Sequence, residues 1–151
     1  MLFRSRDNLE ALAPMLTEAT DRERLAALDA WEQRAFAALE PVFARRLAEG
    51  RVRECHGDLH LGNVTEFDGR TTVFDCIEFN DAFRWIDVMS ELAFMTMDLQ
   101  AHRLPALAHR LLNAYLEHSG DDAGLRVLPY YAMHRALVRA KVAAIGAAQH
   151  G

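Results

Sequence analysis

The most informative segment for the fold is HGDLHLGNVTEFDGRTTVFD, residues 56–75. Its first part, residues 56–63, is polar and contains glycine, which is typical of a loop rather than of a regular element. Two runs rich in β-branched residues follow, at 64–67 and 71–74, and they flank the AspGly pair at 68–69. This arrangement predicts a β-hairpin with a two-residue turn.

The hairpin has a consequence for three polar residues. Because a tight hairpin brings its two ends side by side, we expect Asn63 and Asp75 to lie close together. Asp58 precedes Asn63 by five residues in the loop that enters the hairpin, so it can share the same pocket. Carboxylate and amide oxygens in this number suit Mg²⁺, which takes few protein ligands and completes its shell with water and phosphate.

The segments around this stretch have helical periodicity. Apolar residues at three- and four-residue steps predict an amphipathic helix from about residue 22 to residue 48, ending at Gly50, with a kink or a break into two helices at Pro41. A short strand is expected at 52–55, and further helices at 87–99, 103–118 and 129–147. The predicted fold class is α+β and mainly α-helical.

Composition limits the functions that are open to the chain. The 151 residues suffice for a single domain, and the net charge of −5 disfavours nucleic acid or an anionic membrane as a partner. No apolar run is long enough to span a membrane, and the first residues lack the pattern of a signal peptide. We therefore expect two reduced cysteines and a cytoplasmic protein. The acidic residues are concentrated in 58–91, which contains eight acids and two bases.

The motif HxDxxxxN, followed by a hairpin and Asp75, resembles the catalytic layout of kinase-like phosphotransferases. The sequence HGDLHLGN…VFDCIEF resembles the corresponding segment of the aminoglycoside phosphotransferase and choline kinase family. More narrowly, RECHGDLHLGN, FDCIEFND and IDV…ELAFMTMDL resemble an uncharacterised bacterial subgroup whose members are often fused to a P-loop kinase-like domain. The similarity runs from about residue 51 to residue 99.

The resemblance implies a fold and a reaction. The fold is the C-terminal, catalytic lobe of a protein-kinase-like enzyme, with residues 1–50 helical, 51–86 carrying the catalytic loop and the metal-binding hairpin, and 87–151 helical. The reaction is transfer of the γ-phosphate of ATP or GTP, with Mg²⁺, to a hydroxyl of a small-molecule acceptor. Nucleotide and acceptor are then the expected partners.

The resemblance also assigns roles to single residues. Asp58 would be the catalytic base, and Asn63 and Asp75 would hold the magnesium ions that bridge the nucleotide phosphates. His56 would orient the loop, and His60 would have an accessory role near the transferred phosphate. The remaining assignments are structural or accessory: Asp87 would tie down the backbone of the catalytic loop, and Glu78 and Asp81 would tune the metal site or meet the acceptor.

The N-terminal lobe of such a kinase is not recognisable in the sequence. The eight glycines never form GxGxxG, and the single lysine, Lys141, lies after the catalytic loop. We therefore predict that the N-lobe is absent, that the chain binds nucleotide weakly and turns over little by itself, and that its exposed cleft face can mediate self-association. Arg135, Arg139 and Lys141 are expected to form a solvated helix face.

Two other interpretations remain open at this point. His56, Asp58 and His60 alternate in the manner of a transition-metal site, which would suit a metal-dependent hydrolase or phosphoesterase. Alternatively, the chain is a kinase-derived binding module without catalysis.

Overall fold

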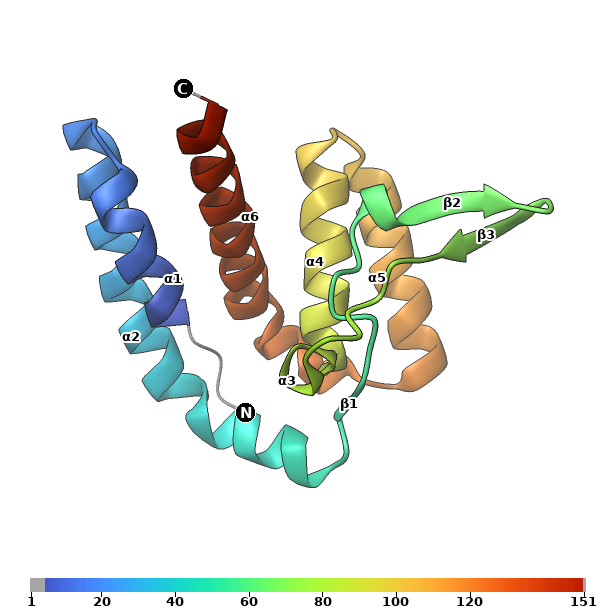
Figure 1. The fold of residues 1–151 in the computed structure, drawn as a ribbon. Helices are drawn as coiled ribbons and strands as arrows, with labels where there is room; N and C mark the ends of the chain where they lie inside the picture. Colours follow the sequence, from blue (N-terminus) through green and yellow to red (C-terminus); the bar gives the residue numbers. More distant parts are fainter. Residues whose placement is uncertain (1–4, 151) are drawn as a thin grey trace.

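The computed structural model describes residues 5–150, which form a helical body with a projecting hairpin (Figure 1). The predicted fold class, α+β and mainly helical with a hairpin after the catalytic loop, is confirmed. The helices are α1 (Ser5–Leu12), α2 (Ala19–Ala48), α3 (Asp81–Arg84), α4 (Val88–Ala101), α5 (Pro105–Ser119) and α6 (Leu128–His150), with short 3₁₀ turns η1 (Ala13–Met15), η2 (Leu61–Asn63) and η3 (Asp122–Arg126). The strands are β1 (Val52–Glu54), β2 (Val64–Phe67), β3 (Arg70–Val73) and β4 (Trp85–Asp87).

Helix α4 is the centre of the body and packs against both α5 and α6. It carries apolar residues all round and is buried along nearly its whole length, as expected of a core helix. Met89 and Ala93 are fully buried in the main core cluster, together with Tyr130 and Tyr131 of α6. Polar groups on α4 therefore need partners inside the protein. The loop of residues 56–63, which we expect to be the catalytic loop, supplies two backbone N–H groups, to Glu91 and to Asp98.

Helix α2 is a single helix, so of the two outcomes predicted at Pro41, a kink or a break, the break does not occur. Proline removes one backbone N–H from the helix ladder, but Pro41 is exposed, so that solvent can satisfy the carbonyl group left without a partner. The helix bends along its length instead (Figure 1). It ends as predicted near Gly50, whose φ of 70° allows the chain to turn towards β1.

The hairpin forms at the predicted place, with its second strand one residue earlier than expected. β2 and β3 pair antiparallel from Val64 opposite Val73 to Phe67 opposite Arg70. The two turn residues have positive φ values, 52° for Asp68 and 70° for Gly69, as a type I′ turn requires. Figure 1 shows the hairpin extending away from the helices.

A second strand pair was not predicted from the sequence. β1 pairs antiparallel with β4, with Val52 opposite Asp87 and Glu54 opposite Trp85. Each strand has three residues, too few to show a period of two, and their partners lie far apart in the chain. This pair joins the end of α2 to the start of α4, and the catalytic loop begins directly after β1.

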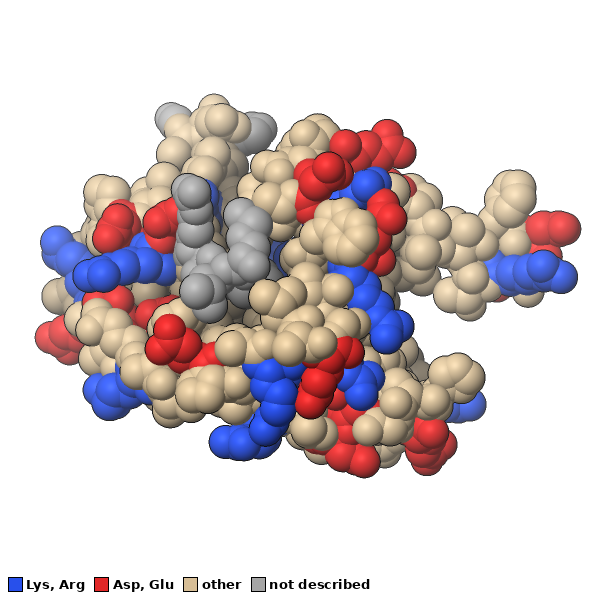
Figure 2. Space-filling model, turned by 90° about the horizontal axis from the view of Figure 1, so that it is seen from below, with Lys and Arg blue, Asp and Glu red and all other residues tan. Residues whose placement is uncertain are grey.

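The surface agrees with the modest net charge. On the face shown in Figure 2, acidic and basic side chains are interspersed rather than gathered into one patch of a single sign. Within residues 5–150, no helix combines the length and the apolar character that crossing a membrane requires.

Candidate active site

The catalytic loop requires glycine at position 57. Gly57 has a φ of 86°, in the left-handed region that side chains disfavour. A Cβ atom there would lie 2.7 Å from the carbonyl oxygen of Phe83 and 3.2 Å from Cδ1 of Ile77. The loop therefore passes close against the segment that precedes β4, and only glycine fits.

Three buried charged side chains hold the loop backbone, and we call them the loop clamp: Glu91 and Asp98 on α4, and Arg135 on α6. Glu91 Oε2 accepts the N–H of Gly57 at 3.0 Å, and Asp98 Oδ2 accepts the N–H of Leu61 at 2.9 Å. Arg135 Nη1 donates to the carbonyl oxygen of Gly57 at 3.1 Å. The helices thus fix the loop from behind, through its backbone.

The loop clamp was not predicted from the sequence. Arg135, expected on a solvated face, is only 7% exposed, so that part of the prediction is wrong. Glu91 and Asp98 gave a usable signal, since they lie about two turns apart on one side of an otherwise apolar helix. A carboxylate at such a place needs a buried donor. Arg135 gave no comparable signal, because two further basic residues, Arg139 and Lys141, follow it on the same helix.

Burial works against both charges nearest to Gly57. It raises the pKa of Glu91, an effect that the hydrogen bond from Gly57 and the charge of Arg135 oppose. It lowers the pKa of Arg135, while Glu91 and Asp58 favour its charged form. Among the described residues, Glu91 Oε1 and Arg135 Nη2 are buried without a hydrogen-bond partner. The loop clamp therefore holds the backbone at an electrostatic cost.

Asp58 follows Gly57 directly, and its carboxylate is held on one side. Asn63 Nδ2 donates to Asp58 Oδ2 at 3.2 Å and to the Asp58 carbonyl oxygen at 3.0 Å. His60 Nε2 lies 3.4 Å from the same Oδ2. The Asp58 side chain is 43% exposed, so an oriented carboxylate faces solvent.

The two histidines of the loop are held by hydrogen bonds that set their tautomers. His56 Nδ1 accepts the N–H of Asp58 at 3.3 Å, so its Nε2 carries the proton and donates to the carbonyl oxygen of Phe74 at 2.7 Å. His60 Nδ1 accepts the N–H of Gly62 at 3.1 Å, which leaves the proton on the Nε2 that faces Asp58. His56 therefore ties the loop to the end of the hairpin, and His60 supports Asp58.

These hydrogen bonds disfavour the hydrolase interpretation. A transition-metal site would need a ring nitrogen lone pair from His56 and from His60. The lone pair of each ring, on Nδ1, already accepts a backbone N–H. Within the described part of the chain, no group of three or more His, Cys, Asp or Glu side chains is arranged to hold a metal ion.

Asp75 lies at the end of the hairpin where Asn63 begins it. The N–H of Phe74 donates to the carbonyl oxygen of Asn63 at 3.0 Å, so the two ends are joined as the sequence predicts. Asp75 is exposed and has a φ of 60°, an uncommon conformation that is often found at functional sites. Asn63 donates from its amide nitrogen to Asp58 and is 7% exposed. An amide and a carboxylate are residue types that could supply oxygen ligands to Mg²⁺.

Two of the accessory residues, Asp87 and Asp81, contact residues outside the catalytic loop. Asp87 was expected to tie down that backbone, but the loop clamp has this role, and Asp87 instead caps α4 by accepting the N–H of Met89 at 2.9 Å. Asp81 begins α3, is exposed and lies 3.5 Å from Arg84. Glu78 is exposed.

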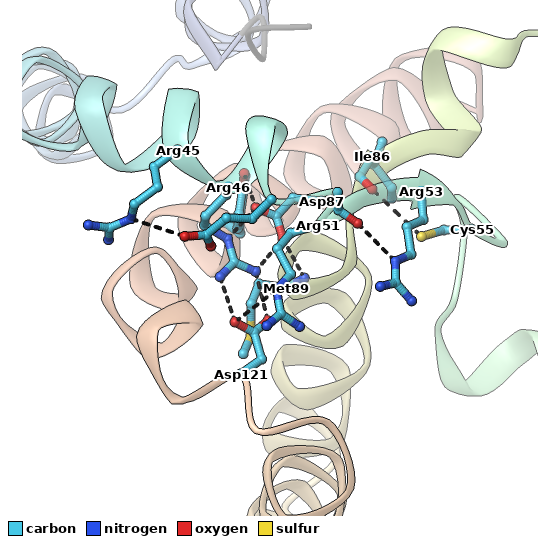
Figure 3. Close-up of polar contacts among 12 residues, drawn as sticks. Arg45, Arg46, Arg51, Arg53, Cys55, Ile86, Asp87, Met89 and Asp121 are labelled. Atoms are coloured by element: carbon cyan, nitrogen blue, oxygen red, sulfur yellow. Dashed lines mark hydrogen bonds and ion pairs between the residues drawn. The ribbon is translucent and has the colours of Figure 1, made fainter.

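Asp87 belongs to a second buried group, the Arg46 cluster, which consists of Arg46, Asp87 and Asp121 (Figure 3). The Arg46 guanidinium donates twice to each carboxylate, at 2.6 and 2.8 Å to Asp87 and at 2.8 Å in both bonds to Asp121. Tyr131 donates to Asp87 at 3.1 Å, and Tyr115 donates to Asp121 at 3.0 Å. This cluster joins α2, β4 and the turn before α6.

Comparisons with known proteins identify relatives of this chain. Uncharacterized proteins from Mycobacterium bovis and from two strains of Mycobacterium tuberculosis are each 37% identical to the chain over 103 residues. The match covers 68% of this chain and 21% of each relative, so the chain spans about a fifth of their length. No solved structure is significantly similar to it. A model of the phosphotransferase enzyme family matches residues 1–129, and the chain therefore belongs to this family, the aminoglycoside phosphotransferase-like proteins.

Proposed function

We propose that the chain is the catalytic lobe of a small-molecule kinase that transfers the γ-phosphate of ATP or GTP to a hydroxyl group. The observation that carries the proposal is the Asp58 carboxylate, which Asn63 and His60 hold through one oxygen while it remains open to solvent. A kinase of this layout needs such a carboxylate to orient the acceptor hydroxyl. Membership of the phosphotransferase enzyme family supports this chemistry.

Each residue of the site has a task in this reaction. The Asp58 carboxylate would accept the hydrogen bond of the acceptor hydroxyl and take its proton as the hydroxyl oxygen bonds to the γ-phosphorus, while the bond from that phosphorus to the departing nucleoside diphosphate breaks. Asn63 and Asp75 would hold Mg²⁺, which supplies positive charge for the nucleotide phosphates. His60 keeps Asp58 in place, and His56 keeps the loop joined to the hairpin.

The finer features of the prediction are part of the same proposal. A further lobe that grips the nucleotide is required, so the 151 residues alone bind nucleotide weakly. Exposed aromatic side chains near the site, Phe74, Phe79 and Phe83, support self-association or contact with another lobe through the cleft face. A cytoplasmic location is consistent with Cys55 and Cys76, neither of which forms a disulfide.

The test is Asp58→Asn in the full-length protein that carries this chain. Phosphate transfer from Mg·ATP is measured against a panel of amino alcohols, sugars and aminocyclitols. We expect a loss of about 10²–10⁴-fold, the usual contribution of a general base. The matched control is Asp68→Asn at the hairpin tip, which removes the same charge away from the site and should leave the rate unchanged.

Three results would count against the proposal. Unchanged transfer in Asp58→Asn would remove the catalytic base, and unchanged biological activity in that variant would favour a binding module. Robust phosphate transfer by the 151 residues alone would overturn the prediction that another lobe is needed.

A further inference from the structure

Arg135 lies outside the residues that match the family, yet it contacts the catalytic loop. The family match ends at residue 129, within the first turn of α6, and Arg135 follows on that helix. Its side chain crosses to α4, where Nε donates to Ser90 Oγ at 3.2 Å, and it reaches the Gly57 carbonyl oxygen through Nη1 at 3.1 Å. The guanidinium also lies over the ring of Phe94, 5.1 Å from its centre.

Two routes lead from Arg135 to the Asp58 carboxylate. The first is the backbone, because Gly57 is the residue directly before Asp58. The second passes through rings: the Phe94 ring centre lies 5.4 Å from that of His60, and His60 Nε2 lies 3.4 Å from Asp58 Oδ2. A displacement of Arg135 therefore affects both the backbone and the side-chain support of Asp58.

The contacts use features that only arginine has. Its planar fork directs two donors at Ser90 and Gly57 while its face stacks on Phe94, which a lysine ammonium cannot do. A methionine would fill the same space without burying a charge. Arg135 keeps its charge in a buried place where Nη2 finds no partner among the described residues.

We propose that Arg135 is a positioning residue for Asp58, so that the C-terminal helix α6 forms part of the catalytic unit. The inference rests on the proposed function in that Asp58 is taken as the catalytic base. Its structural part, that Arg135 holds the loop and the His60–Asp58 contact, can be tested without any catalysis.

The experiment compares Arg135→Met and Arg135→Lys with the unaltered 151-residue chain by NMR. The first readout is hydrogen exchange of the loop amides in residues 57–63. Loss of a hydrogen bond to a charged group should speed this exchange about tenfold or more in Arg135→Met, and less in Arg135→Lys. Exchange in α5 should stay unchanged.

The second readout is the tautomer of His60, seen in the ¹⁵N shifts of its ring and assigned by the loss of its signal in His60→Gln. The unaltered chain should show the proton on Nε2, and Arg135→Met should show a mixture of tautomers. Arg110→Met, which makes the same change on the exposed surface of α5, is the control and should alter neither readout.

The proposal is overturned if folded Arg135→Met keeps both the loop exchange rates and the His60 tautomer of the unaltered chain. Where Arg135→Met does not fold, Arg135→Lys decides by the same two readouts. In the full-length protein, Arg135→Lys should lower kcat about tenfold with little change in the KM for ATP. If Asp58→Asn has no effect on transfer but Arg135→Met changes both NMR readouts, the proposed function fails and the role of Arg135 in holding the loop stands.

Discussion

The Arg46 cluster and the loop clamp are both built from buried charges, but they satisfy them differently. In the Arg46 cluster, the guanidinium donates twice to each of two carboxylates, and Tyr115 and Tyr131 complete the set. In the loop clamp, Glu91, Asp98 and Arg135 each form a hydrogen bond with a backbone group of the loop. The first group pairs side chains with one another, and the second fixes a loop in space.

The pKa shifts have opposite signs in the two groups. Burial by itself would raise the pKa of Asp121, but the hydrogen bonds and charge of Arg46 outweigh it and lower that pKa. Burial raises the pKa of Glu91, and its partners do not outweigh it. The Arg46 cluster therefore favours the charged form of its carboxylate, whereas the loop clamp holds the catalytic loop in one conformation although burial disfavours its charges.

The largest effect is expected from Arg46→Met. It would leave Asp87 buried without its counter-charge and Asp121 with Arg51 at 3.8 Å in place of two hydrogen-bonded pairs, which costs about 3–5 kcal/mol of unfolding free energy. The measurement is urea denaturation followed by circular dichroism. Arg45→Met is a control at the next residue, where the exposed pair with Glu49 should contribute less than about 0.5 kcal/mol. A loss under 1 kcal/mol in Arg46→Met would contradict the stabilising role of the Arg46 cluster.

The next largest effect is expected from Gly57→Ala, which adds a Cβ atom to the loop that the loop clamp holds. A Cβ at a φ of 86° and 2.7 Å from the Phe83 carbonyl oxygen should cost about 2–4 kcal/mol. Gly69→Ala, at the hairpin turn with a φ of 70° and open space around it, isolates the backbone strain and should cost about 1 kcal/mol. Equal losses in the two variants would show that the loop is free to move away from Phe83.

The smallest effects come from replacing one carboxylate by an amide in each group. Asp121→Asn in the Arg46 cluster should cost about 2 kcal/mol at pH 7. Glu91→Gln should change stability by less than about 1 kcal/mol, because the amide oxygen can still accept the Gly57 N–H and the buried charge is removed. Equal losses in the two variants would end the distinction between the groups.

Asp121 and Glu91 make the unfolding free energy depend on pH in opposite directions. The stability that Asp121 contributes is present above its ordinary pKa of 3.8 and is lost as pH falls through the lowered value. The contribution of Glu91 is present below its ordinary pKa of 4.5 and is lost as pH rises through the raised value. Urea denaturation between pH 3 and pH 7 should show each trend weakened in the corresponding variant.

Much of the local structure could be predicted from the sequence. Apolar periodicity predicts the helices α4, α5 and α6. Turn chemistry predicts the turn at Asp68 and Gly69, and the hairpin then brings Asn63 close to its other end. The pairing of β1 with β4 could not be predicted, because three-residue strands carry no pattern and their partners are distant in the chain. Of the kink or break expected at Pro41, the break does not occur, because the exposed side of α2 tolerates a proline.

The order of residues along the chain was enough to predict the local arrangement of the candidate site: a loop with Asp58 and Asn63, a hairpin, and then Asp75. The way in which that loop is held depends on tertiary packing. Arg135 reaches Gly57 across 78 residues, and Arg46 reaches Asp121 across 75. Such contacts depend on how whole helices pack, because a buried charge is stable only where a distant partner meets it, and no local pattern records that meeting.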